Sequence, residues 1–296
     1  MATLGIVINP TSGRGRGKAD GAAAKVEFAK HGVDLVDLSA DSFQAASVNA
    51  KKAIQEKTIE GLIVVGGDGM FHLAVNATAN TDFPVGLIAA GTGNDSARAL
   101  KLPIHDVVAG VKHIVDRLEQ TRVVDLIESQ SDSKKFYSFG AVSAGFDALV
   151  NKRANLWTWI KGPVKYRLAM YRELAAFKPI SYRAVIDGKE RIFEANLCTV
   201  SNCPSYGGGL YITPEASVDD GSLDLFILNS ISRMELIKLF PTVYEGKHVT
   251  HPAVEIIRAK EVTLHSPGMP AYSDGEHVGE SPVTCTVAPK ALRVFA

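Results

Sequence analysis

The chain has few cysteines for its length, and this scarcity limits how its fold can be held together. Only Cys198, Cys203 and Cys285 are present among 296 residues. They are odd in number and form no Cys-x-x-Cys pair, which argues against a disulfide framework and is typical of a protein in a reducing compartment. We therefore expect three buried, unpaired thiols.

Long apolar runs and a signal peptide are also lacking. No apolar stretch approaches the roughly 20 residues that a membrane-spanning helix requires. Residues 1–10 contain no basic segment and reach a turn too early for a signal peptide. We expect a cytoplasmic protein whose contact with a membrane, where its substrate requires one, is peripheral.

Neither charge is in excess. Lysine plus arginine and aspartate plus glutamate number 32 each, so the formal net charge is +0. No overall field would draw the protein to nucleic acid or to an anionic bilayer, and any such attraction must come from a local patch. Nucleic acid is therefore not an expected partner.

The first part of the chain alternates apolar strands with helices. Strands are predicted at 4–8, 33–38, 61–65 and 85–89, with helices at 22–30, 43–55, 71–79 and 94–100. Strands this uniformly apolar are usually buried on both faces, which indicates a parallel sheet covered by helices.

Beyond residue 126 the pattern changes to short alternating strands separated by turns, with helices predicted at 164–177 and 233–243. The fold class predicted is therefore α/β with two lobes. Residues 1–125, together with 289–296, are expected to form a parallel-sheet nucleotide-binding domain, and 126–288 a largely antiparallel β domain that binds the substrate.

Three polar, glycine-rich loops each follow a predicted strand of the first lobe. They are 9–13 (NPTSG), 66–69 (GGDG) and 91–95 (GTGND). The carboxyl ends of parallel strands lie at one edge of a sheet, where open α/β folds bind ligands. Glycine allows backbone to approach phosphate closely, and N–H groups before a helix attract anions. Together the loops predict a nucleotide cradle, although each alone has a simpler interpretation as a turn or helix cap.

Standard phosphate-binding motifs do not account for these loops. Residues 13–18 (GRGRGK) lack the spacing and the hydroxyl of a P-loop, and 91–96 lack the third glycine of a dinucleotide motif. Asp68 lies between glycines, where its carboxylate would repel phosphates unless a cation bridged them. Magnesium is the cation expected, because it prefers oxygen ligands and substrate phosphates.

Taken together, the three loops resemble the diacylglycerol kinase catalytic-domain family, which includes sphingosine kinases and bacterial YegS-like lipid kinases. The second lobe adds GGG at 207–209, DDGSLD at 219–224 and DGE at 274–276, in the order found in bacterial members. The resemblance extends over nearly the whole chain. It implies a lipid kinase that moves the γ-phosphoryl group of ATP to a lipid hydroxyl, with diacylglycerol as the expected acceptor and phosphatidic acid as the product.

The resemblance also implies a role for each matching residue. Glu276 would be the general base toward the acceptor hydroxyl, and Asp68 would act with a catalytic Mg²⁺. A structural Mg²⁺ would be bound by Asp220, expected to be a buried carboxylate, and by backbone carbonyls of Ser217 and Ser222. The residues implied to hold ATP are Asn9, Pro10, Thr11, Ser12, Gly13, Ser39, Gly66, Gly67, Asp68, Gly69 and Thr92.

The chain departs from the family directly after GGDG. Family members usually have a threonine there, often followed by an asparagine and a glutamate, whereas this chain has Met70, Phe71, His72 and Leu73. The departure leaves nucleotide preference open and favours one alternative, a non-catalytic lipid-binding regulatory protein. Retention of the three acidic residues with implied roles argues against it. An NAD kinase-like enzyme, which would also have GGDG, is disfavoured because no Asn-Glu dipeptide occurs in the chain.

A basic, aromatic segment at 151–178 is a candidate for peripheral contact with a membrane. It has seven lysines and arginines against one acid, and both tryptophans, Trp157 and Trp159, lie in it. Basic groups and amphipathic aromatic rings are typical of membrane interfaces. A helix pair packed on the second lobe is the alternative. The sequence does not decide whether the protein is a homodimer.

Overall fold

The computed structural model describes residues 2–131, 134–145, 149–150, 153, 156–157, 168–169, 172 and 179–296. The chain forms two compact units, one of residues 1–125 with 290–296 and the other of residues 126–289. Each unit has its own hydrophobic core, as independent domains do.

The first unit is built on a parallel sheet. Its strands, in spatial order, are β2 (Asp34–Asp37), β1 (Thr3–Ile8), β3 (Gly61–Gly66), β4 (Pro84–Ala89) and the last residues of β15 (Val283–Val294). All pairs among these strands are parallel. Every residue of β3 is buried, because the central strand is covered on both faces.

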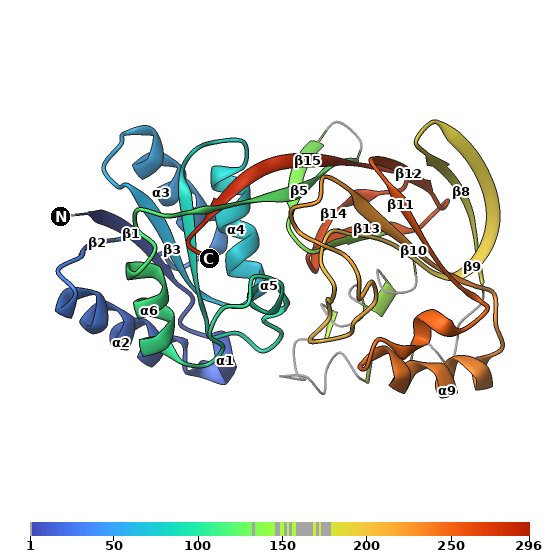
Figure 1. Cartoon of the computed structure of the whole chain (residues 1–296), viewed down its shortest axis with the longest axis horizontal. Coiled ribbons are helices and arrows are strands. Elements are labelled where there is room, and N and C mark those ends of the chain that lie inside the picture. Colours follow the sequence, from blue (N-terminus) through green and yellow to red (C-terminus); the bar gives the residue numbers. More distant parts are fainter. Residues whose placement is uncertain are drawn as a thin grey trace. The chain divides into compact units, whose positions relative to one another are not determined.

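Helices cover both faces of this sheet. They are α1 (Ser12–Gly15), α2 (Gly17–Lys30), α3 (Phe43–Gln55), α4 (Asp68–Thr78), α5 (Asp95–Ala99) and α6 (Val107–Val115). Phe28 of α2 and Ile114 of α6 share one core with Ile6 and Ile63 of the sheet, while α3 packs against α4 (Figure 1). This division follows from right-handed crossovers, because β2 lies on one side of β1 and the later strands lie on the other.

The second unit is dominated by antiparallel pairing. Its strands are β6 (Lys134–Ser138), β7 (Ala141–Ser143), β8 (Ile180–Ile186), β9 (Lys189–Ser201), β10 (Leu223–Asn229), β11 (Val254–Ala259), β12 (Glu261–His265), β13 (Pro270–Ser273) and β14 (Glu276–Glu280), with parts of β5 (Arg122–Ser131) and β15. The long strand β9 is central, since it pairs with β7, β8 and β10. Helix α9 (Arg233–Val243) and the 3₁₀ helix η1 (Lys247–Thr250) also belong to this unit, and α9 buries Leu239 and Val243 against Phe226.

The structure confirms the predicted fold class, because parallel α/β structure is followed by largely antiparallel strands. Two helices begin earlier than predicted: α2 at Gly17 and α4 at Asp68. Apolar periodicity could not show this, since α2 begins with glycines and polar residues and α4 begins with Asp68 and Gly69. The predicted helix at 233–243 coincides with α9, whereas the one at 164–177 lies mostly outside the described residues.

The three cysteines are unpaired and buried, as predicted. Burial raises the pKa of Cys285 to about 12, so its thiol is protonated at neutral pH. Among the helices in the described ranges, none is long and apolar enough to cross a membrane.

The C-terminus of the chain completes the first core. Phe295 is 2% exposed, donates its N–H to Val85 O, and its ring would lie 3.0 Å from a Cβ placed on Gly61.

We predict that Phe295→Ala lowers the free energy of unfolding by about 3 kcal/mol in urea titrations, because a buried ring is lost. Phe43→Ala is the matched control, since Phe43 is 41% exposed. Equal losses at both positions would contradict this role for Phe295.

Candidate functional site

Two of the glycine-rich loops touch backbone to backbone. A Cβ added to Gly91 would lie 2.2 Å from Gly67 Cα and 2.9 Å from Gly67 N, and one added to Gly67 would lie 3.0 Å from Gly91 Cα. No side chain fits between the two loops without moving one of them. The glycines therefore allow the loops after β3 and β4 to meet.

The first loop lies beside these two. The N–H of Asn9 donates to Val65 O at 3.1 Å, and Asn9 Oδ1 accepts from Thr11 N–H at 3.0 Å and Thr11 Oγ1 at 2.9 Å. Gly13 has a φ of +57°, and a Cβ there would lie 2.5 Å from Ala90 O, just beyond β4. The loop thus bends across the carboxyl ends of β3 and β4.

Ser39 joins the same edge from the loop after β2. Its Oγ accepts the N–H of Ile8 at 2.9 Å, at the end of β1. The residues predicted to hold ATP are therefore brought together at one edge of the sheet. Pro10, Thr11 and Thr92 are exposed there, and Gly66 is buried behind them. Whether they bind ATP stays a prediction.

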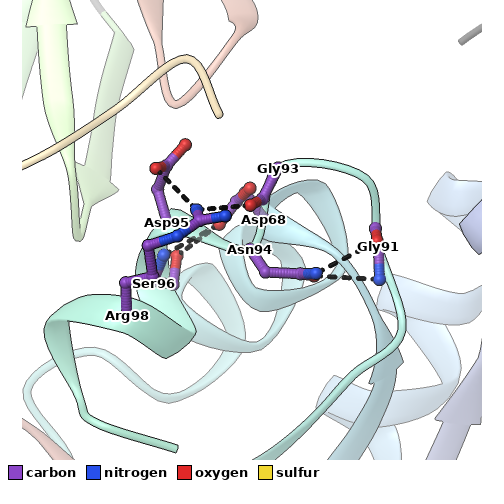
Figure 2. A network of polar contacts seen from close by, with 7 residues as sticks. All are labelled: Asp68, Gly91, Gly93, Asn94, Asp95, Ser96 and Arg98. Carbon is purple, nitrogen blue, oxygen red and sulfur yellow. Dashed lines mark hydrogen bonds and ion pairs between the residues drawn. The ribbon is translucent and has the colours of Figure 1, made fainter. Parts of the chain in front are cut away.

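Asp68 lies at the start of α4, where the loop of residues 91–95 and the start of α5 hold its carboxylate. Its Oδ1 accepts the Ser96 N–H at 2.9 Å and the Ser96 hydroxyl at 3.0 Å (Figure 2). Its Oδ2 lies close to Gly93, where an added Cβ would approach to 2.7 Å. A larger residue at position 93 would displace the carboxylate.

The loop of residues 91–95, which reaches Asp68, is held by hydrogen bonds within residues 91–98. Asn94 has a φ of +58°, accepts the Gly91 N–H at 2.9 Å and donates to Gly91 O at 3.0 Å. Arg98 Nη1 donates to Gly93 O and, at 3.0 Å, to Asp95 Oδ1 (Figure 2). Asn94 occupies the N-cap position of α5, but its side chain makes no cap bond and closes the loop onto Gly91 instead.

Two carboxylates, those of Asp68 and Asp95, lie close enough at this edge for the charge of Asp95 to act on Asp68. Burial raises the pKa of Asp68, the negative charge of Asp95 raises it further, and the hydrogen bonds from Ser96 oppose both effects. Sequence reasoning missed Asp95 as a site residue. Its place in the GTGND motif was the available signal, because that loop follows the strand next to the one that precedes Asp68.

These oxygen donors fit a magnesium ion, which prefers carboxylates together with phosphate and water oxygens. Among the described residues, no group of three or more His, Cys, Asp or Glu side chains gathers to hold a metal. Protein side chains at this edge would therefore supply only part of a magnesium coordination shell.

The residues that depart from the family pattern lie in the core. Met70 and Leu73 are 7% and 1% exposed, and a Cβ on Gly66 would lie 2.5 Å from Met70 Cγ. His72 is also buried and its Nε2 lies 3.2 Å from Asn76 Nδ2. Met70 thus packs behind the GGDG loop, and Asp68 keeps its position beside Ser96.

In the second unit, the surroundings of Asp220 differ from the expectation. Asp220 is exposed, because residues 219–222 form a surface turn before β10. Its Oδ1 accepts the Ser222 N–H at 3.0 Å and its Oδ2 pairs with Arg258 at 2.7 Å, while Ser217 Oγ donates to Asp219. The expected buried carboxylate was therefore wrong, and the structural magnesium stays a prediction.

Glu276 is exposed on β14, directly after the turn of Asp274 and Gly275. These two residues have φ values of +48° and +88°, the left-handed pair that a two-residue hairpin turn requires. The turn therefore forms the tip of the β13–β14 hairpin. Of the basic segment at 151–178, only a few residues, Trp157 among them, belong to the described part of the chain.

Comparisons with known proteins agree with one another. Residues 3–129 match the family described as diacylglycerol kinase catalytic domain, and residues 140–296 match the YegS C-terminal NAD kinase beta sandwich-like domain. A diacylglycerol kinase of Mycobacterium tuberculosis is 40% identical over 97% of this chain and 93% of its own length. One from Staphylococcus carnosus is 30% identical over 98% of this chain and 94% of its own.

A solved structure extends the agreement to the fold. The crystal structure of a diacylglycerol kinase from Bacillus anthracis matches with a TM-score of 0.71 and 20% identity, covering 99% of this chain and 96% of the other. At this identity the match bears on the fold alone.

The raised pKa of Asp68 leads to a prediction on stability. A carboxyl group whose pKa is higher in the folded state than in the unfolded state destabilises the fold once the pH lies above both values. Asp68→Asn should therefore raise the Tm at pH 7, by about 3 °C if the gain is near 1 kcal/mol. The difference from wild type should shrink as the pH falls through the folded-state pKa of Asp68. Thermal unfolding at several pH values tests this, and a Tm difference that does not change with pH would refute it.

Proposed function

Because the chain belongs to the diacylglycerol kinase catalytic-domain family, we propose that it transfers the γ-phosphoryl group of ATP to a lipid hydroxyl. Diacylglycerol is the proposed acceptor and phosphatidic acid the product. The observation that carries this proposal is the meeting of three loops at one sheet edge, with Asp68 fixed by Ser96. The M. tuberculosis relative, 40% identical, supports the choice of acceptor, since it is named a diacylglycerol kinase.

The edge suits phosphoryl transfer, which needs positioning and charge neutralisation more than covalent chemistry. In the proposal, the loops of Asn9–Gly13 and Gly66–Gly69 hold the ATP phosphates by close backbone approach. Asp68, with Asp95 beside it, would hold Mg²⁺. That ion, when bound, neutralises charge on the phosphates.

Glu276 is proposed as the general base. Its carboxylate would take the proton of the acceptor hydroxyl while the hydroxyl oxygen bonds to the γ-phosphorus and the bond to the leaving ADP oxygen breaks. Exposure of Glu276 on a hairpin tip supports this role, because a base must be accessible to its substrate.

The departure from the family at Met70 and Leu73 is compatible with catalysis. Met70 and Leu73 are buried, so they occupy core positions. Asp68 and Asp95 accept hydrogen bonds from Ser96 and Arg98, respectively. A non-catalytic scaffold would have no chemical need for a carboxylate with a raised pKa, which costs stability. Peripheral membrane contact through residues 151–178 stays a prediction.

The function itself can be tested directly. The protein is incubated with γ-labelled ATP, Mg²⁺ and a panel of lipids that includes diacylglycerol, sphingosine and monoacylglycerol, with NAD as a non-lipid acceptor. We expect label in phosphatidic acid. Labelled NADP in place of labelled lipid, or no transfer to any acceptor, would overturn the proposal.

Glu276 can be tested by kinetics. We predict that Glu276→Gln lowers kcat at least about a hundredfold, as loss of a general base does, while the KM for ATP changes little. Glu280→Gln is the matched control, because Glu280 is exposed on the same strand and lies beside His277. Activity close to wild type in Glu276→Gln would remove Glu276 from the mechanism.

The structural magnesium is tested separately from catalysis. If Asp220 binds Mg²⁺, the ion must compete with Arg258 for its carboxylate, so added Mg²⁺ should raise the Tm of wild type and chelation should lower it. Asp220→Ala should abolish the dependence, and Asp219→Asn should keep it. A wild-type Tm that does not respond to Mg²⁺ would exclude this site.

A further inference from the structure

The hairpin that presents Glu276 is weakly held by its own strand pairing. Between β13 and β14 the register shifts after Ala271, and only two pairs, Tyr272 with His277 and Ser273 with Glu276, lie between that irregularity and the turn. A bulge interrupts the ladder and bends the strand. From outside the hairpin, Tyr272 and Ser273 of β13 pair with Ser143 and Val142 of β7, so β13 is anchored, while β14 pairs only with β13 among the strands that the structure describes.

Asp274 adds contacts at the turn itself, between β13 and Glu276. Its Oδ1 accepts the N–H groups of Gly140 and Ala141, and its Oδ2 accepts that of Phe139, all at 3.0 Å. Its own N–H donates to Ala141 O at 3.0 Å. A Cβ on Gly140 would lie 2.9 Å from Asp274 Oδ1, so this turn can receive the carboxylate because it has a glycine.

The segment that Asp274 grips is held from its other side by a buried residue. Asn202, which is 1% exposed, donates its backbone N–H to Gly140 O at 2.8 Å and its side-chain amide to Phe139 O at 3.0 Å. Asn202 thus fixes the carbonyls of Phe139 and Gly140, and Asp274 fixes the N–H groups of residues 139–141. The hairpin tip is tied to an anchored part of the second unit.

We propose that Asp274 is the positioning residue for Glu276: it fixes the turn two residues before the general base and so sets where the base carboxylate stands. The inference rests on the proposed function, because it assigns Glu276 the role of base. Displacing a catalytic group by about 1 Å can lower the rate about a hundredfold. Asp274 touches no reacting atom in this proposal and acts only through Glu276.

The chain contains its own control for a merely structural role. Asp187 and Gly188 form the turn between β8 and β9, with φ values of +46° and +79°. Asp187 Oδ1 accepts the N–H groups of Lys260 and Glu261 at 2.9 Å, and its own N–H donates to Glu261 O at 3.0 Å. This is the same turn with the same kind of clamp, although more exposed and followed by Lys189.

The experiment compares Asp274→Ala with Asp187→Ala. We expect Asp274→Ala to lower kcat ten- to a hundredfold with the KM for ATP unchanged, and Asp187→Ala to leave kcat within about twofold of wild type. Asp274→Asn, which retains an acceptor for Gly140 and Ala141, should recover part of the loss. Equal losses of kcat in both alanine variants would overturn the proposal.

A double-mutant cycle separates positioning from general destabilisation. In a Glu276→Gln background, Asp274→Ala should lower the Tm as it does in wild type but should leave kcat nearly unchanged, because no base remains to be positioned. A second loss of kcat of the same size as the first would overturn the proposal.

Hydrogen exchange gives a readout that needs no activity. Asp274→Ala should speed exchange of the amides at 273–280, and Asp187→Ala should not. If wild type transfers phosphate to no lipid, the proposed function fails, and this comparison still decides whether Asp274 holds the hairpin. Unchanged exchange at 273–280 would overturn the proposal in either case.

Discussion

The backbone contact between Gly67 and Gly91 is the constraint on which the candidate site of the first unit depends. Strands β3 and β4 are neighbours, so their following loops must either diverge or touch, and glycine at both positions lets them touch. Once they touch, the start of α5 comes within hydrogen-bond distance of Asp68 at the start of α4. Loop composition, which looks like ordinary turn chemistry in the sequence, is therefore what assembles the acidic edge.

That acidic edge is costly in the absence of a ligand. Asp68 is desolvated by burial and repelled by Asp95, and although hydrogen bonds from Ser96 oppose both effects, the pKa of Asp68 still lies above its ordinary value. A cation between phosphates and carboxylates would relieve the repulsion, so the same arrangement that weakens the free fold would strengthen nucleotide binding in the proposed reaction. Functional sites commonly combine local destabilisation with ligand affinity in this way.

The sequence predicted the fold class well, because apolar strands such as β3 have a strong signal. It also grouped the three loops correctly, since parallel strands must end at one edge. It failed where the deciding contact depends on the geometry of the backbone. The pairing of Asp220 with Arg258 and the closure of Asn94 onto Gly91 depend on turn geometry that composition does not reveal. Met70 could not be placed in the core from its motif position alone.

The two Asp-Gly hairpins show why motif and role must be separated. At Asp187 and Asp274 the same dipeptide adopts the same left-handed turn, and its carboxylate grips backbone N–H groups of a neighbouring strand or turn. Their local physics is nearly identical, so the turn alone cannot distinguish a structural clamp from one with a functional consequence. The difference lies in the strand that leaves each turn: Lys189 begins a long strand, whereas Glu276 begins a short one whose pairing is interrupted after His277. Strand β14 has few pairs of its own and β13 is anchored on β7, so in the proposal the clamp at Asp274 sets the position of Glu276 by fixing the turn between them.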